Sequence, residues 1–324
     1  MRVQDLLAHI ETVARPDLAA SWDQSGIQIA GTAQHITKMA VTLDAVPATV
    51  TAALDWGADF ILTHHPLSLK PTLPSACDAY HRILRSTLEA GVWMYAAHTS
   101  LDAQPNGPVA WLADALGLQQ RSVVSPSCTE RARVYQIHGL SNGSGLEELP
   151  GVFDIRQTGT SEWEVTAWPQ AEAAISALPA RRVHVQEALH PCKVYGFGCA
   201  GRLATPVSAE RFTEQVAALL NIRGWNEIGL RPETLSTVAY CPGSGADFAS
   251  AAFGAGADVF LTGDVKYHQA QQVESLGWTL DVGHFSLEEH MMSSWAERLS
   301  EELLDEHIAV AFFPGNNPLT LSTG

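Results

Sequence analysis

Histidine and carboxylate side chains recur in this chain at a spacing that suits metal binding. Two phrases share the form His-x-Ser-Leu-(Asp/Glu), in which a carboxylate follows a histidine by four positions. The first phrase contains His98 and Asp102, and the second contains His284 and Glu288. Imidazole and carboxylate ligands suit zinc, manganese, iron or nickel, whereas metals that prefer thiolates would find no partner here. The chemistry that this pattern indicates is metal binding.

Two adjacent histidines, His64 and His65, end the segment GADFILTHH, and a related segment, GADVFLTGD, ends at Asp264. In both parts of the chain such a segment precedes a His-x-Ser-Leu phrase. A repeat this long indicates duplicated domains rather than a solenoid, so we expect two related α/β halves. Asp264 and the nearby His268 stand where the first copy has its histidines. They either line the pocket or, in the case of Asp264, cap a helix.

The elements that must position these residues are short apolar strands alternating with helices. Such alternation predicts mostly parallel sheets covered by helices. In open α/β sheets, ligands collect beyond the carboxyl ends of the strands. Each candidate ligand group follows a predicted strand, so we expect strand ends from both halves to converge on one site. The strands expected before the candidate ligands are Phe60–Thr63, Trp93–Ala97 and Thr279–Val282.

The number of candidate ligands indicates more than one metal ion. One catalytic zinc usually has three or four protein ligands. Two divalent ions bridged by a carboxylate and a water or hydroxide would use five. Two such ions carry four positive charges, and two carboxylates with one hydroxide return three, so the remainder favours a small anionic substrate such as a phosphate ester or nucleotide. The expected ligands are His64, His65, Asp102, His284 and Glu288.

His98 is open to three interpretations. It could bind metal, it could orient Asp102, or it could be a core histidine. We favour a supporting role or a proton relay.

The middle of the chain differs from both flanking parts. Its strands and helices follow the order β-α-β-β-α-β, with the first helix expected at Gly145–Leu149, which suits a small ferredoxin-like α+β insert. We therefore expect a first α/β half over residues 1–124, the insert over 125–200 and a second α/β half over 201–324. The two halves would pack around the shared metal site.

Composition excludes several classes of function. The net charge is −16, with 35 acidic and 19 basic residues, which opposes the attraction that drives nucleic-acid binding. The five cysteines form no C-x-x-C pair, so neither a disulfide framework nor a thiolate zinc site is indicated. No run of 18 uncharged apolar residues occurs. We expect a cytoplasmic protein with no membrane segment and no nucleic-acid partner.

Several motifs together resemble the YbgI-like dinuclear metal-centre family, whose members are often labelled GTP cyclohydrolase I type 2 homologues. They are WDQSGIQIAG, GADFILTHHPL, AAHTSLDA, GSGADF, LTGDVKYH and GHFSLEEH. The resemblance implies the same five ligands, with Glu288 as the bridge, and a ring-shaped hexamer. The chain departs from the family in its short insert, in the Cys after His190-Pro191, and in Asp23-Gln24 where Asp-Asn is usual.

These observations together predict a metal-dependent hydrolase, cyclohydrolase-like or phosphoesterase-like. A metal-bridging hydroxide would attack an electrophilic carbon or phosphorus of a small anionic or nucleotide-like substrate. The alternative is a protein without enzymatic activity, a ring that binds or stores metal or regulates partners.

Overall fold

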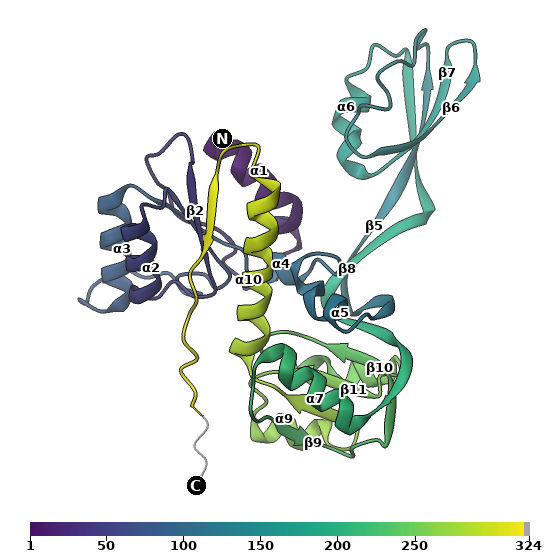
Figure 1. Cartoon of the computed structure of the whole chain (residues 1–324). Coiled ribbons are helices and arrows are strands. Elements are labelled where there is room, and N and C mark those ends of the chain that lie inside the picture. The colour runs from purple at the N-terminus through teal and green to yellow at the C-terminus, as the bar shows by residue number, and fades with distance from the viewer. Residues whose placement is uncertain (321–324) are drawn as a thin grey trace. The chain divides into compact units, whose positions relative to one another are not determined.

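The computed structural model describes residues 1–320, which divide into two compact units (Figure 1). The larger unit consists of Met1–Ser125 together with the chain from Gly196 onward, and it contains every candidate ligand. The smaller unit is Pro126–Tyr195. The division of the larger unit into two halves, and the boundaries expected for them, stay predictions.

The first sheet of the larger unit has five strands in the order β1-β4-β3-β2-β13. Strands β4, β3, β2 and β13 run parallel, and β1 is antiparallel to β4. The parallel strands expected in the first half are confirmed, whereas β13 comes from the far end of the chain and was not expected. The bounds are β1 Gly26–Ile29, β2 Lys38–Thr42, β3 Phe60–Thr63, β4 Trp93–Ala96 and β13 Ala309–Phe312.

Helices cover both faces of this sheet because its central strands are apolar on both sides. Successive side chains of a strand point to opposite faces. Phe60 and Leu62 of β3 therefore pack with α1 and α10, while Ile61 packs with α2 and α3. No helix in the described part of the chain has both the length and the apolar character needed to cross a membrane. The helices are α1 Val3–Val13, α2 Pro47–Trp56, α3 Ala79–Ala90 and α10 His284–Glu302.

The second sheet has eight strands in the order β6-β7-β5-β8-β10-β11-β12-β9. Its part in the larger unit consists of the strands from β8 to β9 in this order. Strands β10, β11 and β12 are parallel, and they are flanked by the antiparallel β8 and β9. The long helix expected over Leu287–Glu306 begins earlier, at His284, and ends at Glu302. The bounds are α7 Ala209–Leu220, β9 Asn226–Ile228, β10 Thr234–Tyr240, α8 Ala249–Gly254, β11 Val259–Thr262, α9 Tyr267–Val273 and β12 Trp278–Asp281.

The smaller unit contains strands in the order β6-β7-β5-β8, with β7 antiparallel to both β5 and β6. This is the strand order of a ferredoxin-like unit. The helix expected at Gly145–Leu149 is wrong, because the segment forms turns. Gly145 has a φ of 88°, a left-handed conformation that interrupts a helix. The bounds are β5 Gln119–His138, β6 Val152–Gly159, β7 Glu162–Ala167, α6 Glu172–Ser176 and β8 Arg182–Ser208.

Candidate metal centre

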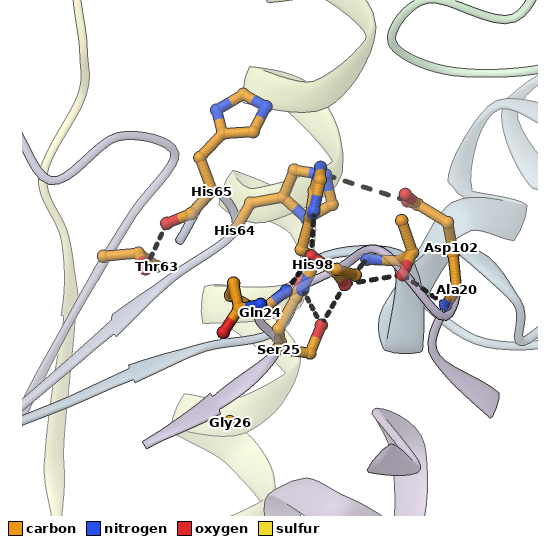
Figure 2. A network of polar contacts seen from close by, with 12 residues as sticks. Ala20, Gln24, Ser25, Gly26, Thr63, His64, His65, His98 and Asp102 are labelled. Atoms are coloured by element: carbon orange, nitrogen blue, oxygen red, sulfur yellow. Dashed lines mark hydrogen bonds and ion pairs between the residues drawn. The ribbon is translucent and has the colours of Figure 1, made fainter. Parts of the chain in front are cut away.

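The predicted ligands meet where strands β3, β4 and β12 end. Figure 2 shows the contribution of the first sheet, with the His64 and His98 rings and the Asp102 carboxylate lying close together. Asp102 is the last residue of the short helix α4, Thr99–Asp102, which follows β4. The start of α10, directly after β12, supplies the remaining two residues, His284 and Glu288.

Glu288 lies at the centre of the cluster. Its Oε2 atom is 2.7 Å from His284 Nε2 and 3.1 Å from His65 Nε2. Its Oε1 atom is 3.6 Å from His64 Nε2, and that nitrogen is 3.8 Å from Asp102 Oδ1. One carboxylate therefore approaches three histidines, and the five residues expected as ligands lie in one place.

Two sets of ligand atoms in the described residues are close enough to hold metal ions. One set comprises His64, His65 and His98, and the other comprises His65, His284 and Glu288. Within each set the ligand atoms lie within 4.8 Å of one another. His98 thus stands beside the expected ligands, and its assignment as relay or support stays a prediction.

Hydrogen bonds at Nδ1 hold all four histidine rings. Carboxylate and carbonyl oxygens can only accept, so each ring donates from Nδ1–H. The bonds run from His64 to Ala97 O at 2.8 Å, from His65 to Asp44 at 2.7 Å, from His98 to Asp23 at 2.7 Å and from His284 to Asp264 at 2.8 Å. Each ring thereby leaves Nε2 available to a metal ion, and partners of this kind orient metal-binding histidines in proteins.

Three buried atoms in the cluster have no hydrogen-bond partner. They are His64 Nε2, Asp102 Oδ1 and Glu288 Oε2. The short contacts of Glu288 Oε2 have suitable distances, but their directions are not those of hydrogen bonds. Most buried polar side-chain atoms are paired, and an orphan of this kind is costly. Cations bound in this cluster would provide partners for such atoms, so the residues present fit divalent metal ions.

The charged groups of the cluster shift one another's pKa. Burial alone would lower the pKa of His65, but the neighbouring carboxylates of Asp44 and Glu288 raise it to about 10. Burial likewise opposes the rise of the His284 pKa to about 9, which comes from Glu288 and Asp264. Burial would raise the pKa of Glu288, yet the histidines hold it well below its usual value. Protons therefore compete with cations for the histidine nitrogens.

A cavity of about 600 Å³ opens onto the cluster. This volume lies within the range of small-molecule sites. His65, His98, Asp102, His284 and Glu288 all contribute to its lining. A ligand in the cavity would therefore contact the metal-binding side chains directly.

The sequence pattern of one protein family matches almost the whole chain. Residues 1–318 fit Duf34/NIF3 (NGG1p interacting factor 3). The chain belongs to this family. A relative from Staphylococcus epidermidis, named GTP cyclohydrolase 1 type 2 homolog, is 25% identical over 352 residues, covering 94% of both proteins. The family resemblance noted in the sequence is thereby confirmed.

Two solved structures share the fold of this Duf34/NIF3 chain. A Bacillus cereus protein related to NIF3 has a TM-score of 0.86 at 23% identity, over 99% of both chains. The protein ybgI has a TM-score of 0.67 at 21% identity, over 98% of this chain and 100% of its own. At these identities the likeness concerns the fold, and it confirms the expected α/β class.

Two supporting residues of this Duf34/NIF3 chain were missed in the sequence, Asp23 and Asp44. Asp44 could have been found, because it follows the strand next to β3. Asp23 approaches His98 from a separate segment, and in the sequence only its place in the motif WDQSGIQIAG marked it. The two candidates from the segment LTGDVKYH have different surroundings. Asp264 accepts a hydrogen bond from His284, whereas His268 is exposed and contacts Gln271.

Proposed function

We propose that this chain is a metal-dependent hydrolase with two divalent cations, Zn, Fe, Mn or Ni. The observation that carries the proposal is the group of buried, unpaired ligand atoms beside the cavity, on His64, Asp102 and Glu288. Glu288, which approaches three histidines, would bridge the two ions. The ligand set is the one expected from the sequence, His64, His65, Asp102, His284 and Glu288.

Divalent cations bound there would act as Lewis acids and lower the pKa of water toward neutrality. The protein's part is to fix the donors in advance. The Nδ1 bonds to Asp44, Asp264 and Ala97 hold three rings in one orientation, so little reorganisation accompanies binding. Opening of a heterocyclic ring, which the name of the Staphylococcus epidermidis relative suggests, and cleavage of a phosphoester both fit this arrangement.

His98 is the residue best placed to move a proton. Its Nδ1 is anchored to the buried carboxylate of Asp23, and its ring packs against His64 and His65 at centroid distances of 5.2 and 5.4 Å. Nε2 is therefore free to exchange a proton with substrate, while Asp23 stabilises the charged ring. If His98 is instead a metal ligand, the variant His98→Gln loses metal. A relay variant keeps its metal and loses turnover.

The alternative of a metal store or regulator needs ligands but no cavity. A space of about 600 Å³ in contact with Glu288, His284 and Asp102 favours an enzyme. We also carry over the hexameric ring expected from the family resemblance, which light scattering of the purified chain would test.

The experiment combines metal analysis with a hydrolysis screen. Metal-replete protein is expected to hold about two ions per chain and to hydrolyse a member of a panel of nucleotides, heterocycles and phosphoesters. Glu288→Gln should abolish both properties. The matched control is Glu289→Gln, because Glu289 is the next carboxylate of α10 but bonds Gly315 N instead of the cluster.

Each possible outcome separates the candidates. Fewer than one ion per chain in metal-replete wild-type protein would refute the metal centre. Two ions with rapid exchange and no turnover anywhere in the panel would favour the store. Loss of activity in Glu289→Gln as large as in Glu288→Gln would show that general damage to α10 explains the result.

A further inference from the structure

The walls of the cavity are apolar and aromatic away from the metal cluster. We propose that this cavity binds a flat, uncharged heterocycle and discriminates against polyphosphates. The proposal rests on the proposed function, because it concerns the substrate of the same site. It departs from the anionic substrate that the charge count in the sequence favours.

Aromatic rings reach the cavity from three separate segments. Trp22 precedes β1 and is 59% exposed, although its ring lies edge-on to His98 at a centroid distance of 5.8 Å. Phe197 of β8 and Phe248, which precedes α8, stack on each other at 5.8 Å. Aromatic side chains offer large faces for stacking on planar ligands. A tryptophan left open to solvent beside a metal cluster is explained by such a ligand.

Side chains with a permanent positive charge are absent from the described residues that line the cavity. Among its lining residues in the described chain there is neither Lys nor Arg. Arg and Lys are the side chains that usually bind phosphate groups. The lining instead includes the carboxylates of Asp102, Asp247 and Glu288, so a phosphate group would depend on the metal ions for positive charge.

The charge of the loaded site is also unfavourable for a polyanion. Behind the histidines stand three further carboxylates, those of Asp23, Asp44 and Asp264. With the three carboxylates of the lining, they exceed the four positive charges that two divalent ions would bring. The count made from the sequence included only two carboxylates, and this is why it favoured an anion. At these short distances solvent ions screen little.

The polar groups outside the metal cluster suit ring N–H donors. Ser244 and Asp247 line the cavity and are exposed. The Asp247 carboxylate accepts a hydrogen bond from Gln269 and has room to accept another. An ionised carboxylate selects donors such as the N–H groups of a heterocycle and rejects phosphate oxygens.

The test compares nucleosides with their triphosphates on metal-loaded protein. Adenosine, guanosine, cytidine and uridine are titrated by calorimetry, with tryptophan fluorescence as a second readout. At least one nucleoside is expected to bind roughly tenfold more tightly than its triphosphate. Trp22→Ala should weaken nucleoside binding about tenfold, while the matched variant Trp22→Phe retains most of it. Metal content should not change in either variant.

A gain of function provides an independent check. Ser244→Lys places a cation at the cavity and should strengthen triphosphate binding about tenfold with little effect on the nucleoside. Tighter binding of the triphosphates than of the nucleosides by wild-type protein, or binding of no nucleoside, would overturn the inference. If the protein holds no metal at all, the proposed function fails instead, so the two failures are distinguishable.

Discussion

Strands β3 and β11 lie in the two similar sequence segments GADFILTHH and GADVFLTGD, here called the first and second copy, yet the residues that follow the two strands have different roles. β3 is followed by His64 and His65, whose rings face the cluster. β11 is followed by Gly263 and Asp264, of which only Asp264 approaches the cluster, as the hydrogen-bond partner of a ligand. The first copy supplies imidazole nitrogens to the cluster at this position, and the second supplies a carboxylate that holds the His284 ring.

Packing explains why the second copy has no histidine there. A Cβ atom on Gly263 would collide with the backbone of Gly283 and His284, where α10 begins. The start of α10 therefore excludes any side chain at this point. Helix α10 is 19 residues long, and Glu288 in its second turn is buried. Its counterpart α4 has four residues and ends at Asp102. The two similar segments thus contribute unequally to the cluster.

Substitution of the two carboxylates, Glu288 and Asp102, should have the largest effect and tests whether the two copies contribute unequally. Glu288→Gln is expected to lower metal affinity by more than roughly 100-fold, since loss even of an outer partner costs about 10–100-fold and Glu288 faces three histidines. Among the four histidines, Asp102 forms an ion-pair contact with His64 alone. Asp102→Asn should therefore weaken the binding of one metal ion and spare the binding of the other. Competition with a chromogenic chelator measures both affinities. Equal losses in the two variants would show that the copies contribute alike.

Substitution of Gly263, which follows β11, should have the next largest effect, on the stability of the fold. Gly263→Ala should lower the free energy of unfolding by about 1–3 kcal/mol, as expected for an overpacked site. The control is Gly254→Ala at the end of α8, where an added Cβ meets no atom within 4 Å and alanine favours the helix. Urea titration compares the two variants. A Gly263→Ala variant as stable as wild type would remove the packing explanation for the asymmetry.

The supporting carboxylates sharpen the comparison further. Asp264→Ala should reduce metal affinity about 10–100-fold, because His284 loses the acceptor that orients it. Asp23→Asn should leave metal content near that of wild type and reduce turnover, since His98 is proposed to relay protons. Metal content is read by elemental analysis and turnover with the hydrolysed substrate. Metal loss in Asp23→Asn would make His98 a ligand and the copies more alike.

The pH dependence should be the smallest effect. His65 and His284 have pKa values raised from 6.5 to about 10 and about 9. Their contribution to the stability of metal-free protein is complete below pH 6.5 and is lost as the pH rises through 9 and 10. Metal binding displaces the same protons, so the rise in melting temperature on metal addition should grow from pH 6.5 to 9. Calorimetric scans with and without metal measure it, and a constant rise would contradict this linkage.

The local sequence pattern was sufficient to predict the part of the candidate site that lies at the ends of strands. β3 was predicted with its observed bounds because Phe60–Thr63 is apolar on both faces, and the ligands after it follow directly. Asp23 could not be predicted as the partner of His98, because the two lie 75 residues apart and only the fold brings them together. At Gly145–Leu149 the local pattern was misleading. It predicted a helix, but the left-handed backbone of Gly145 leaves the segment as turns.

The pairing of β13 with β2 has a consequence for how the chain is made. Ala309 lies opposite Lys38, so one edge of β2 stays without this partner until β13 has left the ribosome. Met291 and Trp295 of α10 fill the same apolar core as Leu6 and Phe60. N-terminal domains usually fold first during synthesis, but here the first sheet is complete only after β13 has been made. A nascent chain halted before α10 would expose both an open strand edge and an apolar face, the features that recruit chaperones.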